Sequence, residues 1–593
     1  MKFTLKWLKA NYVKTEHMVP MRDGIRLYTS VYAPASRTEA SPVMLVRTPY
    51  PLNPYGKTFI KDLRTHMDNF VANGYILVYQ NVRGTFRSEG EFINVRPLSS
   101  GDIKDPARID EATDTYDTAD WIITHLNTNG SIGVKGISYP GFYATMAAIS
   151  GHPAIKAVSP QAPVTDWYIG DDAHLNGAYQ YGMYSFGAAF CRNRKKPCSI
   201  FPKPVIEIEG NPYDFFMDFG GMKNAYDALE HAFREKGGVP EFISQFRAHP
   251  DYDDFWQRRN AVRDLSSAKA AFLVVGGWYD AEDFYGSLAT YRAAKENGLG
   301  TSFACGPWFH GAWKRKRYDC LGDATFGRGS AEYFMDKIEY PFFAWYLEGK
   351  GTKPQEKAWI LPSSETRPRA AGLTDGQWET YPAWPPAEAG EARLYMSRGG
   401  ILSETPQPGD VMKYVSDPLN PVPFCKEGVG ARDAHVADQS FLEGRSDILS
   451  FVSEPLETTL KAEGHLKACL NITSSTSDAD IVVKLIDLRP DGCQLLIRSG
   501  VMPLRYRSSL SVPEPMVPGK AVDIEFSLND IAHHFLRGHR IMIQIQSSLF
   551  PLVAMNPQSF LPNQYEARPE DYKKAEIALN CGPRSYIALS VVD

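Results

Sequence analysis

The sequence lacks a long apolar run and an excess of basic residues, and each absence excludes a class of protein. No stretch approaches the roughly 18 consecutive apolar residues of a membrane span. The chain has 64 lysine and arginine residues against 69 aspartate and glutamate residues. The formal net charge of -5 therefore lacks the basic excess that is typical of nucleic-acid-binding proteins. Residues 1–18 intersperse lysines among apolar residues, so as written they form no signal peptide. We therefore expect a cytoplasmic protein, or a periplasmic one if a leader was removed, with no membrane or nucleic-acid partner.

The sequence also has little that indicates a metal site or a disulfide framework. Its 8 cysteines are scattered without a C-x-x-C pair, although Cys191 and Cys198 are close enough in sequence to pair. His533, His534 and His539 cluster in "AHHFLRGHR". No Asp, Glu or Cys stands with them, and a surface turn explains them more simply than a metal site. We expect neither a metal nor any other cofactor.

Strand-like and helical segments divide the chain into regions. At 593 residues the chain exceeds one hydrophobic core, so two or three domains are expected. From residue 22 to 163, apolar strands alternate with helical segments, which indicates a parallel sheet covered on both faces. Residues 164–262 are largely helical, and the strand pattern then resumes. After residue 350, Pro-rich connectors and short alternating strands indicate an antiparallel β-sandwich.

One serine stands between two glycines in "VKGISYPGFYATMAA". Gly136, Ser138 and Gly141 form the pattern G-x-S-x-G, with a β-type run before it and an apolar helical segment after it. Such a pattern suits a strand that turns almost at once into a helix, with the serine hydroxyl lifted clear of the sheet. Pro140 suits the first helical turn, where its missing N–H needs no partner. The pattern is common on its own, so Ser138 needs partners before it is a convincing nucleophile.

Two later residues stand where those partners are needed. Asp280 ends "AAFLVVGGWYD" and His310 ends "TSFACGPWFH", each just after an apolar strand. A serine nucleophile needs a histidine base, and the base needs a carboxylate that orients it. The order serine, acid, histidine, with each residue at a strand end, places all three on one side of the sheet.

The sequence resembles the α/β-hydrolases grouped around cocaine esterase, X-Pro dipeptidyl-peptidase and α-amino acid ester hydrolase. The resemblance covers nearly the whole chain, through "MVPMRDGIRLYTSVYAP", "RTPY", "QNVRGTFRSEGEF", "GISYPGF", "GGWYDAEDFYG", "GPWFHG", "YVSDPLNPVPF" and "GHRIMIQIQSS". It implies an α/β-hydrolase core in residues 1–163 and 263–350, an inserted helical cap in 164–262 and a C-terminal jelly-roll β-sandwich in 351–593. It also implies Ser138, Asp280 and His310 as the catalytic triad.

The resemblance further implies an oxyanion hole and an acidic substrate site. One oxyanion donor is the backbone N–H of Tyr139 and the other is the hydroxyl of Tyr50 in "RTPY". In α-amino acid ester hydrolases, the subgroup that this chain resembles most, carboxylates at the positions of Asp172, Glu282 and Asp283 bind the α-ammonium group of the substrate. Three carboxylates beside a serine nucleophile suit a cation better than an apolar acyl group. Read without the resemblance, Asp171, Asp172 and Glu282 are solvated loop carboxylates.

The predicted function is hydrolysis of small-molecule esters or amides of α-amino acids through an acyl-enzyme, with acyl transfer to amines, as in β-lactam synthesis, implied as a side activity. The chain departs from the subgroup at Pro140, where better-known members have an acidic residue, and at the bulkier Ile137. An X-Pro dipeptidyl-peptidase or a general acyl esterase therefore stays open. A non-catalytic protein that binds through its β-sandwich is the alternative of another class. The sequence leaves the oligomeric state open and is compatible with a homo-oligomer.

Overall fold

The computed structural model describes most of the chain: residues 3–36, 39–184, 198–199, 203–315, 318, 320–322, 324–326, 329–364, 378–407, 409–429 and 433–593. Cys198 is a free thiol, whereas Cys191 and the basic run beside it lie outside the described residues. None of the helices in the described part combines the length and the apolar character that a bilayer crossing needs.

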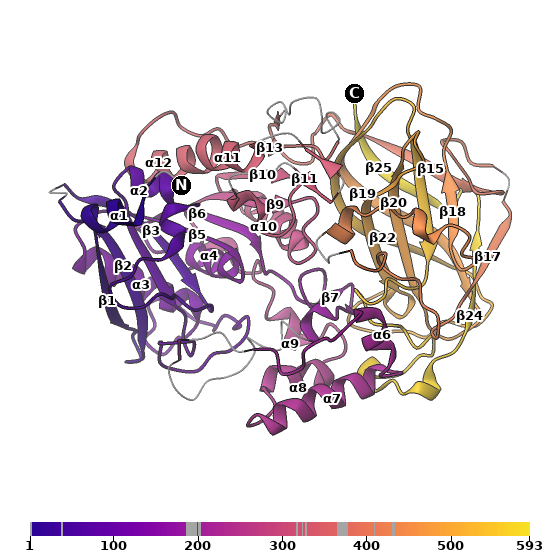
Figure 1. The fold of residues 1–593 in the computed structure, drawn as a ribbon, viewed down its shortest axis with the longest axis horizontal. Helices are drawn as coiled ribbons and strands as arrows, with labels where there is room; N and C mark the ends of the chain where they lie inside the picture. Colours follow the sequence, from indigo (N-terminus) through magenta and orange to yellow (C-terminus); the bar gives the residue numbers. More distant parts are fainter. Residues whose placement is uncertain are drawn as a thin grey trace.

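A mixed sheet forms the amino-terminal half of the molecule (Figure 1), in the order β1-β2-β4-β3-β5-β6-β9-β10-β13-β14. The strands from β4 to β13 in this order are parallel, and antiparallel strands flank them at both edges. Every residue of β4, β9 and β10 is buried, so both faces of the sheet are covered, as near-continuous apolar strands predict. The strands are β1 (Tyr12–Pro20), β2 (Arg26–Pro34), β3 (Ser41–Thr48), β4 (Ile76–Asn81), β5 (Thr128–Ser138), β6 (Ile155–Pro163), β9 (Ala271–Gly277), β10 (Thr301–Gly306), β13 (Ala358–Ile360) and β14 (Glu379–Tyr381).

Helices connect these strands. Helix α4 follows β5 directly and packs on β5, β6 and α3, while α2 and α12 meet through Phe70 and Phe343. Asp110 starts α3 with a side-chain cap on the N–H of Thr113. The helices around this sheet are α1 (Leu5–Asn11), α2 (Asp68–Ala72), α3 (Glu111–His125), α4 (Tyr139–Ile149), α10 (Phe284–Glu296), α11 (Ser330–Tyr333) and α12 (Tyr340–Glu348), with a small hairpin of β11 (Cys320–Leu321) and β12 (Ala324–Thr325).

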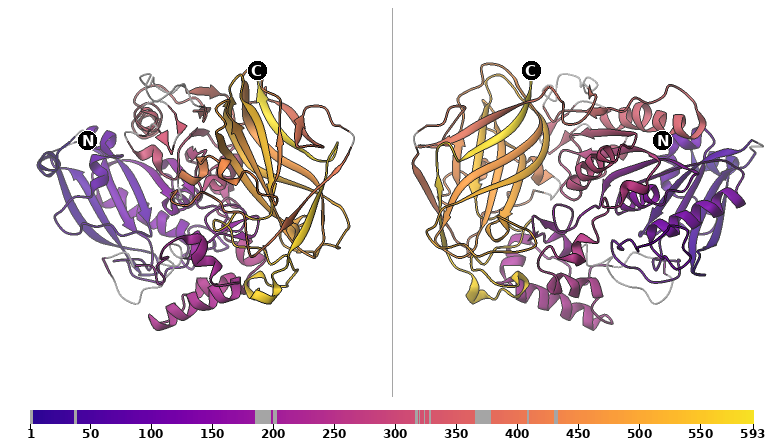
Figure 2. Two further views of the ribbon diagram at one scale, coloured as in Figure 1. Left: turned by 45° about the vertical axis from the view of Figure 1, so that its right-hand side comes forward. Right: turned by 180° about the vertical axis from the view of Figure 1, so that it is seen from behind.

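A largely helical segment lies between β6 and β9, where the sequence predicts the cap. It contains β7 (His174–Leu175), β8 (Ala178–Tyr179), α6 (Pro212–Met217), α7 (Met222–Glu235), α8 (Glu241–Ala248) and α9 (Asp254–Gln257). Its helices lie at one edge of the molecule, between the two large β regions, in the views of Figures 1 and 2. Arg247 of α8 pairs with Glu566 at 2.5 Å, and Tyr213 donates to the carbonyl of Pro421 at 2.8 Å. The segment is therefore fixed to the carboxy-terminal region; its role as a cap stays a prediction.

The carboxy-terminal region is a β domain of mostly antiparallel strands, with one parallel pair, β16 and β18. Its predicted jelly-roll arrangement stays a prediction. The strands are β15 (Gly390–Ser397), β16 (Ile401–Ser403), β17 (Val411–Ser416), β18 (Leu449–Val452), β19 (Leu460–Ser474), β20 (Asp480–Leu488), β21 (Gln494–Pro503), β22 (Val522–Phe535), β23 (Arg540–Gln546), β24 (Ala575–Asn580) and β25 (Tyr586–Val592).

The predicted boundary at residue 350 differs from the sheet pairing. Strands β13 and β14 lie beyond it, yet β13 pairs with β10 and extends the first sheet. The second sheet begins only with β15 at Gly390. β13 and β14 have 3 residues each, too few to show a periodicity in the sequence.

Candidate active site

Ser138 sits at a sharp turn between a strand and a helix. It ends β5 and caps α4 with φ 69° and ψ -131°, a backbone conformation that costs a non-glycine residue free energy. A Cβ on Gly136 would lie 2.1 Å from the carbonyl oxygen of Pro140, and one on Gly141 would lie 2.8 Å from the Cα of Pro163. Only glycine fits at both positions. The turn therefore holds the serine at the carboxyl edge of the parallel sheet, beside a helix N-terminus.

Asp280 and His310 meet at the ends of the neighbouring strands β9 and β10. The Nδ1 atom of His310 lies 2.8 and 3.0 Å from the two carboxylate oxygens of Asp280. Burial raises the pKa of Asp280, but the charge and hydrogen bond of His310 and the backbone N–H groups of Glu282 and Asp283 together outweigh burial, so the pKa lies below its ordinary value. Burial alone would lower the pKa of His310, but Asp280 and Glu282 outweigh burial and raise it to about 9. Asp280 therefore orients the imidazole and stabilises its protonated form.

The Ser138 hydroxyl faces an acidic side chain. Its Oγ donates to Oδ2 of Asp283 at 3.3 Å, and a further hydrogen bond joins it to the hydroxyl of Tyr50. On the other side, Nε2 of His310 lies 3.5 Å from Oε2 of Glu282. Among the described contacts, no hydrogen bond joins Ser138 to His310. The structure thus brings the predicted triad and acidic residues into one site, in which Ser138 contacts Asp283 and His310 contacts Glu282.

The predicted oxyanion donors border the same space. Tyr50 follows β3, and burial followed by the charges of Asp172 and Asp283 raises the pKa of its hydroxyl. The phenol therefore stays protonated and can donate. Tyr139 is the first residue of α4, and its ring is fixed because its hydroxyl donates to Asn94 and accepts from the N–H of Val95.

The three predicted substrate-binding carboxylates converge from two loops. The N–H of Asp172 donates to the carbonyl of Glu282 at 2.9 Å, which joins the loops directly. Asp283 is fully buried, and its Oδ1 has no hydrogen-bond partner within the described residues. Burial raises the pKa of Asp283 well above its ordinary value, and the charge of Asp172 raises it further. Burial also raises the pKa of Asp172, whose carboxylate accepts from Trp167 Nε1 at 3.1 Å.

Asp171 is not the solvated loop carboxylate that the sequence alone suggests. It is fully buried, and its oxygens accept from the backbone N–H groups of Thr165, Asp166 and Gly286 at 2.7–2.8 Å. These contacts tie the loop that carries Asp172 to the first turn of α10. Sequence analysis missed this positioning role because the contact with Gly286 spans 115 residues, and it missed Trp167 because its contact with Asp172 depends on how the loop folds.

One group of side chains among the described residues could hold a metal ion, and it lies away from Ser138. Ligand atoms of Glu379, Glu463 and His534 lie within 4.8 Å of one another. The hydroxyl of Tyr381 contacts both glutamates, at 2.6 and 2.7 Å. The surface turn expected for His533 and His539 is wrong for His533, which is buried; both side chains contact Asp487, 46 and 52 residues away in the sequence. The absence of a metal stays a prediction.

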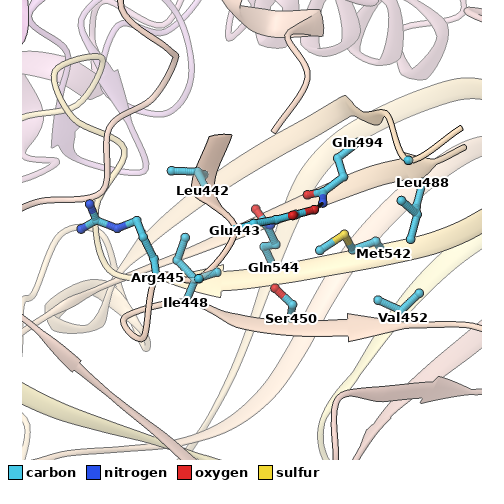
Figure 3. A pocket seen from close by; sticks show the side chains of 12 residues that line it. Leu442, Glu443, Arg445, Ile448, Ser450, Val452, Leu488, Gln494, Met542 and Gln544 are labelled. Atoms are coloured by element: carbon cyan, nitrogen blue, oxygen red, sulfur yellow. Dashed lines mark hydrogen bonds between the residues drawn. The ribbon is translucent and has the colours of Figure 1, made fainter. Parts of the chain in front are cut away.

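A pocket of about 350 Å³ opens in the β domain (Figure 3), lined in part by β18, β20, β21 and β23. Aliphatic side chains form part of its wall, and two of its polar side chains bond to neighbours: Gln494 to Glu443 at 2.6 Å and Arg445 to Asp447 at 2.6 Å. No histidine lines it, so it offers no base for serine chemistry. The chemistry described above belongs to the loops around Ser138.

Comparison with known proteins gives matches over both halves of the chain. Residues 23–312 match the X-Pro dipeptidyl-peptidase (S15) family, and residues 349–587 match the X-Pro dipeptidyl-peptidase C-terminal non-catalytic domain. Cocaine esterase from Rhodococcus sp. (strain MB1 Bresler) is 28% identical over 566 residues, which cover 91% of this chain and 92% of that protein.

Two solved structures match over the full chain. An α-amino acid ester hydrolase superposes with a TM-score of 0.88 and 32% identity, covering 100% of this chain and 98% of that chain. An aminopeptidase from the marine sediment archaeon Thaumarchaeota archaeon has a TM-score of 0.87 and 31% identity over the same shares. The chain therefore belongs to the α/β-hydrolase family of serine esterases and peptidases that includes cocaine esterase, the X-Pro dipeptidyl-peptidases and α-amino acid ester hydrolase.

Proposed function

We propose that this hydrolase acts on esters or amides of α-amino acids and that Asp172, Glu282 and Asp283 bind the substrate's α-ammonium group. The observation that carries the proposal is a pair of carboxyl groups without a lysine or arginine partner among the described residues. In the described part of the chain, neither Asp172 nor Asp283 forms an ion pair with lysine or arginine, although Asp283 is fully buried. Buried carboxylates normally pair with a cation or take up a proton. A substrate ammonium group beside Ser138 supplies the missing charge.

We infer the reaction from the roles that family resemblance and residue chemistry suggest for these groups. His310 takes the proton from Ser138 as the serine oxygen attacks the carbonyl carbon, and Asp280 stabilises the imidazolium that forms. The Tyr50 hydroxyl and the Tyr139 N–H stabilise the negative oxygen of the tetrahedral intermediate. His310 then protonates the leaving group, and water attacks the acyl-enzyme to release the acid. An amine in place of water gives an amide.

The names of the full-length structural relatives support the amine preference. An α-amino acid ester hydrolase and an aminopeptidase both act beside a free amino group, whereas the cocaine esterase is less similar in sequence. An X-Pro dipeptidyl-peptidase also requires a free amino terminus, and it stays the second candidate because the S15 match covers the Ser138 region. An Xaa-Pro anilide cleaved faster than an amino acid methyl ester would favour that candidate.

Alanine methyl ester and methyl propionate test the proposal because they differ only in the amino group. Asp172→Asn or Glu282→Gln removes a charge-assisted contact of roughly 1.5–3 kcal/mol, which lowers kcat/KM for the amino ester by about 10- to 150-fold. The same changes should leave methyl propionate hydrolysis unchanged or raise it. Glu391→Gln is the matched control, since it removes the same charge from an exposed strand of the β domain. Equal losses on both esters would contradict amine recognition.

A further inference from the structure

Two aromatic side chains bound the loop that carries three acids of the proposed site. The loop runs from Trp278 to Phe284, between β9 and α10, and contains Asp280, Glu282 and Asp283. The rings of Trp278 and Phe284 lie 5.6 Å apart. The loop belongs to no strand or helix, so the contacts of these two rings help to fix its position.

The contacts of both rings lead to one residue of the β domain, Asp530 on β22. The Trp278 ring lies 5.5 Å from that of Trp384, whose Nε1 donates to Oδ2 of Asp530 at 2.9 Å. The guanidinium of Arg498, on β21, lies over the Phe284 ring at 4.6 Å, and its Nη2 donates to the carbonyl oxygen of Asp530 at 3.1 Å. A cation over an aromatic face is an attractive contact. Both ends of the acidic loop are therefore connected to the same point of the β domain.

We propose that Arg498 is a positioning residue for the proposed active site. It holds the acidic loop through Phe284, and it adds a positive charge to the surroundings of Asp280. The inference rests on the triad of the proposed function. It gives the β domain a part in catalysis, although that domain matches a family described as non-catalytic.

The charge of Arg498 has no carboxylate partner. Within the described residues Arg498 forms no ion pair, and its buried Nε has no hydrogen-bond partner. The carboxylate of Asp530 pairs instead with Arg292 at 2.7 Å and with His465 at 2.9 Å. Burial lowers the pKa of Arg498 to about 10, so the guanidinium stays charged at neutral pH. The titratable groups that interact with this charge include Tyr279, Asp280, Cys305, His435 and Asp530.

The charge of Arg498 opposes the effect of the acids on His310. Burial lowers the pKa of His310, but the carboxylates around it outweigh burial and raise the pKa to about 9; they belong to Asp280, Glu282 and Asp172. A second cation near the pair of Asp280 and His310 repels the imidazolium. Removing that cation should raise the pKa of His310 further, so that less of the enzyme carries the neutral imidazole that acts as a base.

The pH dependence of kcat/KM for methyl propionate measures this effect, because this ester has no group that titrates. Arg498→Gln removes the charge and keeps an N–H donor for the Asp530 carbonyl, and Arg498→Met is a second neutral variant. We expect the acid limb of either variant to move up by about 1 pH unit, with kcat/KM about 10-fold lower at each pH below the limb. Arg498→Lys keeps the charge and should leave the limb at its wild-type position.

Arg292→Met is the matched control. Arg292 also contacts Asp530, where α10 packs on β22, but it already pairs with the carboxylate. Its loss should lower the melting temperature and leave the acid limb unchanged.

Thermal melting shows which variants are folded. A folded neutral variant with the wild-type acid limb would overturn the inference, and so would a limb that Arg498→Lys moves as far as Arg498→Gln does. Failure of both neutral variants to fold would give Arg498 a purely structural role and would overturn it as well.

The two esters separate this inference from the proposed function. If the limb moves in Arg498→Gln but Asp172→Asn slows both esters equally, the positioning role stands and amine recognition fails. If the limb stays while Asp172→Asn slows only alanine methyl ester, the positioning role fails and the proposed function stands.

Discussion

Acidic side chains are buried at two places along the parallel sheet, around Arg83 after β4 and around Ser138 at the end of β5. Around Arg83 each carboxylate has a basic partner: Arg83 pairs with Asp114 and Asp23 at 2.6 Å, and Arg47 pairs with Glu111 at 3.2 Å. Around Ser138, Asp172 and Asp283 pair with no lysine or arginine in the described part of the chain.

The difference separates acids that hold the fold from acids that serve a ligand. Arg83 is always charged and bonds Asp114 and Asp23, and these carboxylates contribute only if the pairs stay intact. Glu111 is held less firmly, because burial raises its pKa although Arg47 lies beside it. In the second group, Asp172 and Asp283 have no lysine or arginine partner among the described residues. Their burial therefore costs stability, and a bound cation would offset this cost. The comparison therefore predicts opposite results: neutralising a residue of the first cluster harms stability, and neutralising one of the second harms activity.

The largest expected effect is the fall in activity when Ser138 or His310, beside the second cluster, is replaced. Ser138→Ala and His310→Ala should each remain folded and lose several orders of magnitude in kcat/KM. The double variant should be little worse than either single variant, because the residues act as a unit. The rate of ester hydrolysis and the thermal melting curve check both parts. A Ser138→Ala variant that kept about a tenth of wild-type turnover would refute the nucleophile.

The first cluster is broken by Arg83→Met, which keeps an aliphatic stem but leaves Asp114 buried without its closest cation. Removing one partner of a buried ion pair costs about 3–5 kcal/mol. We expect a clear fall in the temperature of the first thermal transition, with activity per folded molecule preserved. Arg26→Met is the control, because Arg26 forms a similar pair with Glu89 on the surface and should change little. Equal shifts in the two variants would contradict the comparison.

The two clusters also differ in how far the sequence predicts them. Ser138, Asp280 and His310 could be proposed because each follows a strand within a short motif, and the contact between Asp280 and His310 follows from adjacent strand ends. Asp171 could not, because its contact with Gly286 spans 115 residues. Arg83 lies within a quoted motif, but its pairing with Asp114 needs the packing of α3.

The same reasoning explains where the fold was predictable. The buried parallel strands β4 and β9 show their burial in the sequence, since most of their residues are apolar. The short strands β13 and β14 depend on pairing with β10 and with each other, which local periodicity does not carry. The catalytic and binding roles of the residues around Ser138 stay predictions for the experiments described.

Tyr50→Phe tests whether the hydroxyl beside the second cluster acts on the transition state. Loss of one oxyanion donor typically lowers kcat by about 100- to 1000-fold, or about 2.7–4 kcal/mol. KM should change much less, because the hydroxyl acts on charge that develops during reaction. Tyr79→Phe is the control: it removes a buried hydroxyl from the neighbouring β4 that has no described hydrogen bond. An unchanged kcat in Tyr50→Phe would make Tyr50 a packing residue only.

The smallest expected effect is on the pH dependence of stability. Asp171, Asp172, Asp280 and Glu282 all face Asp283, and burial together with their charges raises its pKa in the folded protein above the ordinary value of 3.8. Between these two pKa values the folded chain holds a proton that the unfolded chain has lost. The free energy of unfolding therefore falls as pH rises through this window, and the full penalty is present above the folded pKa.

Asp283→Asn cannot titrate, so its melting temperature should fall less than that of wild type between about pH 5 and about pH 8. At the upper pH the variant should be the more stable protein, by less than Arg83→Met loses. Asp254→Asn, on an exposed turn of α9, should keep the wild-type slope. Parallel slopes for wild type and Asp283→Asn would mean that Asp283 is already balanced by a charge in the folded protein. The second cluster would then resemble the first, and the reason to look for a cationic substrate would be lost.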